Sequence, residues 1–181
     1  MDEAYVALVR RLADTRDPEI ISNSSIEHAA VLIGEMFRSG AGQAQIFSGS
    51  LNPALYARED IITCMGSFLA NTNSSLRILL QEESEGKGNA KIFLDQVKER
   101  LGESALSRIE IKQADEFAKA QTYHFATVGQ SSFRFEGDRT KHEAFASFGQ
   151  SAHVNKINGV FDSFWKNAID INTATETATS H

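Results

Sequence analysis

Residues 121–149 read QTYHFATVGQSSFRFEGDRTKHEAFASFG, and this stretch sets the expected fold of the chain. Successive side chains of a strand point to opposite faces, so Tyr123 and Phe125 are expected on one face and His124 and Ala126 on the other. Residues 129–130 are Gly-Gln, which suits a two-residue turn with glycine first. Residues 132–136 alternate again. The stretch therefore predicts a β-hairpin with one aromatic and one mixed polar face, followed by a third strand over residues 143–148.

Helical and strand patterns alternate through the rest of the chain. Apolar residues at helical spacing predict helices over residues 3–14, 26–39, 53–70, 92–101 and 152–168. Short apolar or alternating runs predict strands over residues 44–48, 76–80 and 108–112, and residues 115–119 are expected to form a short connection. Strands that alternate with helices and end in a hairpin cluster indicate an α/β fold, with a mixed β-sheet flanked by helices on both faces.

The chain is expected to divide into three parts. Residues 1–20 form an N-terminal helix or arm, because residues 14–18 read DTRDP and break the helical pattern. Packing of this helix on the edge of the main domain is the favoured interpretation, and a partner-binding arm is the alternative. Residues 21–170 form the α/β domain. Residues 171–181 form a tail that is expected to be disordered, because residues 173–181 read TATETATSH and offer nothing to a core.

Composition and charge narrow the classes of function. The net charge is −6 and the pI is near 5.4, which does not suit a general nucleic-acid binder whose affinity rests on Lys and Arg. The single cysteine, Cys64, excludes an intrachain disulfide and is expected to be a buried small hydrophobe. Neither a basic leader nor an apolar run of membrane-spanning length is visible, so we expect a cytoplasmic protein without a membrane partner. No cofactor is expected.

The order of these features resembles one half of the phospholipase D-like superfamily. In that family a strand carries the signature H-x-K-x4-D, and a Gly/Ser-Asn strand follows it. The histidine attacks phosphorus and becomes a phosphohistidine, the lysine holds the phosphate oxygens, and no metal is needed. The resemblance covers roughly residues 25–168 and rests on the order of elements more than on the motif.

Carried over position by position, the signature is incomplete. His124 matches the histidine, but Ala126 stands at the lysine position and Ser131 at the aspartate position, and the Gly/Ser-Asn element falls loosely on residues 147–149. Without the lysine, the charge that grows on the phosphoryl oxygens is unopposed. The resemblance then implies a domain that has lost its active site and acts as a dimeric interaction subunit in a DNA-handling or defence complex. Its implied partners are a second copy and an unidentified protein, with nucleic acid as a weak ligand.

The alternative function is a metal-independent phosphodiesterase or nuclease. His124 would be the nucleophile, because a neutral imidazole can attack phosphorus. Arg134, on the paired strand, would supply the charge of the missing lysine, and Arg134 and Ser131 are the candidate phosphate or anion contacts. If His124 is not a nucleophile, we expect it to be hydrogen-bonded within the sheet.

Three other sites are weaker alternatives. A metal site would need His142 and His153 to converge with Glu136, Asp138 and Glu143, and the spacing does not force this, so no metal is predicted. A serine nucleophile at residues 131–132 with His124 as its base is less favoured than a serine-containing turn. A set of basic residues in the C-terminal half offers either a phosphate-contacting surface or an ordinary solvated face: Lys112, Lys119, Arg134, Arg139 and Lys141.

Overall fold

The computed structural model describes residues 2–82, 88–138 and 143–171. In this part of the chain eight strands form one sheet in the order β1-β7-β6-β5-β2-β3-β4-β8. The strands are β1 (Ile21–Asn23), β2 (Gln43–Ser48), β3 (Ser75–Leu80), β4 (Ile109–Gln113), β5 (His124–Val128), β6 (Ser132–Asp138), β7 (Glu143–Ser147) and β8 (Ile169–Asp170). The helices are α1 (Glu3–Thr15), α2 (Ile26–Ser39), α3 (Pro53–Tyr56), α4 (Glu59–Ala70), α5 (Asn89–Leu101), α6 (Glu103–Leu106), α7 (Glu116–Lys119) and α8 (Ser151–Trp165).

The sheet is mixed, as the sequence predicts. Strands β2, β3 and β4 run parallel at its centre, and helices connect them along the chain. The β5–β6–β7 meander and β1 pair antiparallel beside β2, while β8 pairs antiparallel with β4. Because β5 is antiparallel to β2, the first residue of β5 lies next to the carboxyl end of β2, on the side of the sheet where all the parallel strands end.

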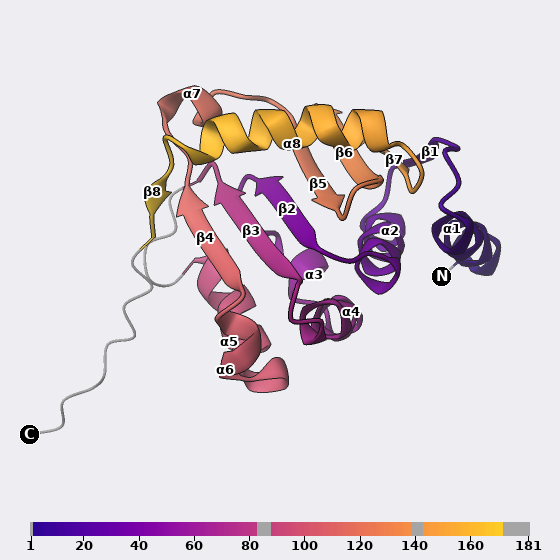
Figure 1. Cartoon of the computed structure of the whole chain (residues 1–181), viewed down its shortest axis with the longest axis horizontal. Coiled ribbons are helices and arrows are strands. Elements are labelled where there is room, and N and C mark those ends of the chain that lie inside the picture. Colours follow the sequence, from indigo (N-terminus) through magenta and orange to yellow (C-terminus); the bar gives the residue numbers. More distant parts are fainter. Residues whose placement is uncertain (1, 83–87, 139–142, 172–181) are drawn as a thin grey trace, which may run out of the picture.

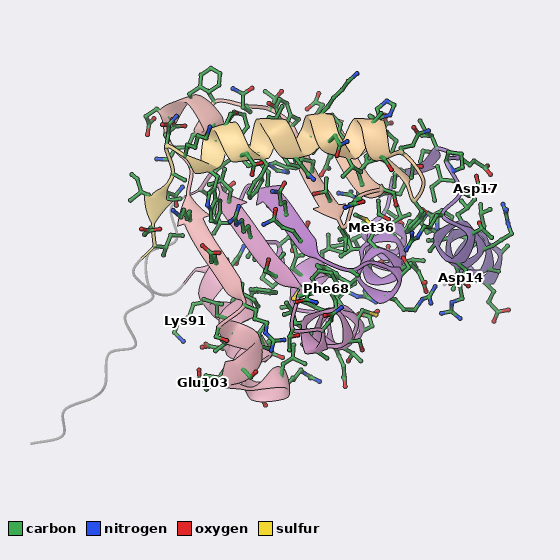
Figure 2. All side chains as sticks on the ribbon, viewed as in Figure 1. Asp14, Asp17, Met36, Phe68, Lys91 and Glu103 are labelled. Carbon is green, nitrogen blue, oxygen red and sulfur yellow. The ribbon has the colours of Figure 1, made fainter. Side chains whose placement is uncertain are left out.

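Two apolar cores lie on the two faces of the sheet. Helix α8 crosses one face (Figure 1), where aromatic residues of the sheet, Phe47 and Phe125, pack with Phe161 and Phe164 of the helix. The other face carries the larger core under α2, α4 and α5. Met36 and Phe68 lie in this larger core, whereas Lys91 and Glu103 are exposed on α5 and α6 (Figure 2). Both faces of the sheet are therefore covered by helices, as the alternating pattern predicts.

Helix α1 packs beside α2 at the edge of the molecule (Figure 1). Its N-cap is Asp2, whose carboxylate accepts from the backbone of Ala4 and Tyr5, which satisfies two of the free amides of the first turn. Val9 and Leu12 are fully buried and belong to the larger core. Ion pairs add to the contact, because Arg38 of α2 reaches Asp14 at 2.5 Å.

Several local predictions are wrong in detail. The helix predicted over residues 53–70 is two helices, because Asn52 caps α3, Ala57 ends it, and the chain is extended at Arg58 before α4 begins. The hairpin turn has three residues and not two, because Val128 pairs with Ser132. Gly129 in this turn has φ +64°, a conformation that favours glycine. The edge strands β1 and β8 have three and two residues, too short to show a period of two in the sequence.

No helix among the described residues is both long enough and apolar enough to cross a membrane.

Candidate functional site

His124 is placed by the sheet register at the edge where β2 and β3 end. It opens β5, and on the neighbouring strand Glu136 stands directly opposite. Ala126, two residues further along the same face, stands opposite Arg134. Alternation therefore brings His124, Arg134 and Glu136 to the face of the sheet under α2, while the aromatic residues of the hairpin face α8.

A pocket of about 480 Å³ opens beside these residues. Its walls come from the end of β1 with the start of α2, the loop that follows β2, helix α3, and the strands β5 and β6. Most of the lining side chains are polar. The lining residues are Asn23, Ser24, Ser25, Ile26, Ala29, Ser48, Gly49, Ser50, Asn52, Leu55, Tyr56, Glu82, His124, Phe125, Arg134 and Glu136.

Gln81 determines which ring nitrogen of His124 carries a proton. Its side-chain nitrogen lies within hydrogen-bond distance of three backbone carbonyls, at 3.1 Å (Ala118), 3.4 Å (Lys119) and 2.7 Å (Gln121). This nitrogen is thereby identified as the amide donor, so the oxygen of Gln81 faces His124 Nε2 at 2.9 Å. An amide oxygen only accepts, and His124 Nε2 must therefore carry its proton. The other ring nitrogen, Nδ1, lies 3.9 Å from the Glu136 carboxylate.

Arg134 is a buried cation in the same pocket. Its side chain is only 8% exposed. The Nε–H donates to Asn23 Oδ1 at 3.2 Å, and Nη1 lies 3.7 Å from Glu136 Oε2. Asn23 is in turn held by a bond from its side-chain nitrogen to the backbone oxygen of Ser25 at 3.4 Å. Arg134 and His124 thus share one carboxylate, and strand β1 holds the arginine from the other side.

Tyr56 and Gly49 complete the walls around these charges. Tyr56 is 6% exposed, and burial raises the pKa of its hydroxyl, with the Arg134 charge lowering it and the Glu136 charge raising it. The phenol therefore stays protonated at neutral pH. A Cβ at Gly49 would lie 3.5 Å from His124 Nε2 and 3.1 Å from the Glu82 carboxylate. The side chains of His124 and Glu82 therefore lie close to the backbone of Gly49, which has no side chain of its own.

Two other predicted positions lie far from His124. Ser131 is in the hairpin turn and accepts a hydrogen bond from Gln150 through its backbone oxygen. The turn follows Val128, which is four positions from His124, or about 13 Å at the rise of a strand. Residues 147–149 end β7 beside the same turn, since Ser147 pairs with Phe133. The structure therefore brings Arg134, and not Ser131 or residues 147–149, into the pocket with His124.

Of the described residues in the candidate metal and phosphate sets, Glu136 and Arg134 line this pocket, and the others do not. Among the residues that the structure describes, no group of three or more His, Cys, Asp and Glu side chains could hold a metal ion. His153 stacks on Phe133 of the sheet with ring centroids 5.9 Å apart. Lys112 pairs with Asp170, and Lys119 with Glu116. His142, Arg139 and Lys141 lie outside the described residues.

Sequence reasoning missed Asn23, Tyr56 and Gln81. Gln81 directly follows a strand with a nearly continuous apolar pattern, and polar residues at the carboxyl ends of parallel strands often line sites. That signal was available to find it. Asn23 lies on a three-residue edge strand and Tyr56 on a four-residue helix, and neither element is visible in the sequence pattern.

Comparisons with known proteins agree with the fold. A family model described as Domain of unknown function (DUF7931) matches residues 25–174. No curated protein matches the sequence. Solved structures do match. The chain resembles Nuc from Salmonella typhimurium, described as a phospholipase D family member, with TM-score 0.61, 12% identity, and coverage of 86% of this chain and 99% of that one.

Two further structures are similar. NucT from Helicobacter pylori has TM-score 0.54 and 9% identity, with coverage of 84% of this chain and 100% of that one. TrmBL2, described as an archaeal chromatin protein with a novel mode of DNA binding, has TM-score 0.58 and 15% identity over 93% of this chain. The chain spans 60% of the length of TrmBL2. At these identities the likeness concerns the fold alone.

Proposed function

The chain belongs to the DUF7931 family and has the mixed α/β fold of a phospholipase D-like half-domain, and we propose that it is a non-catalytic interaction subunit that works as a homodimer. In this proposal His124 is a structural remnant of the nucleophile position. The remaining polar pocket holds a ligand or a partner group without cleaving it.

The hydrogen bond between His124 and Gln81 carries the proposal. A nucleophilic histidine needs a nitrogen lone pair that faces phosphorus. Here Nε2–H donates to Gln81 at 2.9 Å, and Nδ1 faces the Glu136 carboxylate at 3.9 Å. Both ring nitrogens are therefore directed at protein groups. A phosphoester in the pocket would have to displace Gln81, which three backbone carbonyls hold in place.

The charges around His124 support the same proposal. Ala126 at the lysine position offers no charge, and Arg134 opposite it lies 3.7 Å from Glu136, so part of its charge is already compensated. Electrostatic stabilisation of the transition state usually contributes more to catalysis than any other single effect. In this site the cation is paired with a carboxylate, and both histidine nitrogens are directed at Gln81 and Glu136. Such a site is better suited to holding an anion than to transferring a phosphoryl group.

The dimer and the setting of the protein are further parts of the proposal. The two-half enzymes of the resembled superfamily are nearly twice this size, and a single half usually pairs with a second copy. The chain covers Nuc and NucT almost entirely, so both are also of the size of one half. A DNA-handling or defence complex is the setting we propose, and the description of TrmBL2 as a DNA-binding chromatin protein supports DNA handling. The surface we propose for a protein partner is the exposed side of α1 (Glu3–Thr15), whose other side packs on α2.

A hydrolysis assay tests the absence of catalysis. The wild-type protein and His124→Ala would be incubated with a chromogenic phosphodiester and with single- and double-stranded DNA in the presence of EDTA. We expect no turnover by either protein. Turnover that survives EDTA and disappears in His124→Ala would overturn the proposal and identify His124 as the nucleophile.

Sedimentation equilibrium on the wild-type chain tests the dimer. A monomer mass at high protein concentration would contradict the proposed homodimer.

A second candidate function is a metal-independent phosphodiesterase that uses His124 and Arg134. The position of Arg134 favours it, because the register puts this buried cation opposite the lysine position and inside the same pocket. In this function Gln81 would release His124 when substrate binds. The same hydrolysis assay distinguishes the two functions, and Arg134→Met would abolish turnover in the second.

A further inference from the structure

The lining of the pocket beside His124 is rich in hydrogen-bond donors. Arg134 contributes its two terminal nitrogens, neither of which makes a hydrogen bond to another described residue. Tyr56 is 6% exposed, lines the pocket, and its hydroxyl makes no hydrogen bond within the described residues. Neither the Tyr56 hydroxyl nor the terminal nitrogens of Arg134 belong to the fully buried atoms without a partner, so these donors are accessible from the pocket and can bond to something that enters it.

The start of α2 adds to this lining. Ser24, the N-cap residue Ser25 and the first helical residue Ile26 line the pocket, and the positive end of the helix dipole lies there. The side-chain oxygen of Ser25 accepts from the backbone N–H of His28 at 3.1 Å. Ser48 similarly accepts from Leu51, and Ser50 accepts from Asn89. These hydroxyls already accept a bond, so each has its O–H left to donate.

The carboxylates of the pocket limit the charge of the occupant. Glu136 lies 3.7 Å from Arg134 Nη1, and Glu82 stands over Gly49 on the same side as His124. A chain of phosphates would bring further negative charge against these two groups, and like charges at short range repel. The donors suit one small anion, whereas the carboxylates oppose a polyanion such as a nucleic-acid strand.

We infer that the pocket binds a single small oxyanion of phosphate or sulfate size, held by Arg134, Tyr56 and the start of α2 beside His124 and not on it. The anion would receive hydrogen bonds from the guanidinium, from the phenol and from the serine hydroxyls. Asn23 is a positioning residue for this site, because its side-chain oxygen holds Arg134 Nε at 3.2 Å and turns the terminal nitrogens toward the pocket. The inference rests on the proposed non-catalytic function, in which a bound oxyanion is held and not transferred.

Titration with sodium sulfate and sodium phosphate at constant ionic strength tests the inference, with the backbone and arginine side-chain N–H signals followed by NMR. We expect saturable shifts at Arg134 Nε–H and at the amides that begin α2. Tyr56→Phe, which removes one hydrogen bond to a charged group, should weaken binding about tenfold, and Arg134→Met should weaken it at least as much. Arg100→Met, which removes an exposed arginine of α5, is the matched control and should bind like wild type.

His124→Ala decides where the anion lies. We expect this variant to bind sulfate as wild type does. Binding that is lost in His124→Ala and kept in Tyr56→Phe would overturn the inference. Chemical-shift changes that rise linearly with the sulfate or phosphate concentration, or that appear equally in Arg134→Met, would also overturn it. A short single-stranded DNA without terminal phosphate should not displace sulfate, and displacement would overturn the preference for a small anion.

Failure of the proposed function and failure of this inference have different readouts. DNA or diester hydrolysis that depends on His124, together with sulfate binding that depends on Tyr56, would overturn the function and leave the anion site. Absence of hydrolysis together with absence of saturable binding would overturn the anion site and leave the function.

Discussion

Gln81 determines whether His124 is held within the fold or is available to a substrate. Its side chain joins the end of β3 to the segment between α7 and β5 and to His124. A buried amide of this kind stabilises the fold and also selects one tautomer of the imidazole. Position, tautomer and access of His124 are therefore set by a neighbour that lies 43 residues earlier in the chain.

Replacing Gln81 by Met tests this role. The variant keeps the side-chain length but removes the donor to three backbone carbonyls and the acceptor of His124 Nε2–H, so the free energy of unfolding should fall by about 1–3 kcal/mol. Urea denaturation measures the loss, and ¹⁵N chemical shifts of the imidazole report whether Nε2 still carries the proton. Gln130→Met, in the exposed hairpin turn, is the control and should change little. An unchanged tautomer in Gln81→Met would remove Gln81 as its cause.

The sequence supports the choice of His124 and Arg134, but not that of their neighbours. Alternation along residues 123–136 places both side chains on one face only if even-numbered residues of the two strands pair with each other. The predicted two-residue turn would pair Arg134 with Phe125, on the other face, whereas the three-residue turn pairs Arg134 with Ala126 and brings it to the pocket. Asn23 and Tyr56 reach the pocket through tertiary packing of short elements, which no local pattern encodes.

At the scale of elements, the segment between α1 and β1 meets the segment between β7 and α8. A Cβ on Gly149 would lie 2.7 Å from Pro18 N and 2.8 Å from the carbonyl carbon of Asp17, and closer still to the Arg16 oxygen. All three neighbours are backbone atoms, which cannot rotate away. Gln150 also donates to the Pro18 oxygen at 2.9 Å. Glycine at 149 therefore permits a close approach that fixes α1 to the rest of the fold.

Two glycine-to-alanine changes test this contact. Gly149→Ala forces the two segments apart and should lower the free energy of unfolding by about 1–3 kcal/mol, the usual cost of overpacking. Gly159→Ala is the matched control, because a Cβ there meets open space on α8 and alanine favours a helix by up to about 1 kcal/mol. Thermal and urea denaturation should show opposite signs for the two variants. A stabilised Gly149→Ala protein would show that the contact is not close in solution.

The predictability of the elements follows their length. The helix over residues 26–39 and the strands at the centre of the sheet carry full periodic patterns, and the structure has them within one or two residues. The break between α3 and α4 leaves no trace, because apolar residues such as Leu55 and Ile62 continue at helical spacing across it. Where two elements share one apolar pattern, the pattern predicts the buried face and not the break.

At the scale of the whole molecule, the site arises from convergence of distant segments. The pocket combines residues 23–29, 48–56, 82, 124–125 and 134–136, and the sheet order places these segments at one edge. The sequence predicts the class of the sheet and both helical layers, because alternation of strands and helices determines them. It does not predict that β5 lies beside β2, and this neighbour relation brings His124 to the end of the parallel strands.

The three tyrosines are buried, Tyr5 and Tyr123 only in part. Their burial predicts how the free energy of unfolding changes at high pH. Burial raises the pKa of Tyr5 to about 12 and also raises the pKa values of Tyr56 and Tyr123. In an unfolded chain each tyrosine ionises near pH 10. Between about pH 10 and pH 12 the folded state therefore binds more protons than the unfolded state, and stability must fall as pH rises. Below pH 10 both states are protonated and the full contribution of these groups is present.

Absorbance at 295 nm and far-ultraviolet circular dichroism, followed together during alkaline titration, test this linkage. We expect no tyrosinate signal near pH 10 while the native spectrum persists, and then ionisation together with loss of secondary structure. Tyr5→Phe removes a buried hydroxyl that has no hydrogen bond among the described residues, so at neutral pH it should be neutral or stabilising. The same variant should flatten the fall in stability above pH 10. Three tyrosines that titrate near pH 10 in a fully native protein would contradict their burial, and with it the packing of α1, α3 and the segment before β5 against the rest of the fold.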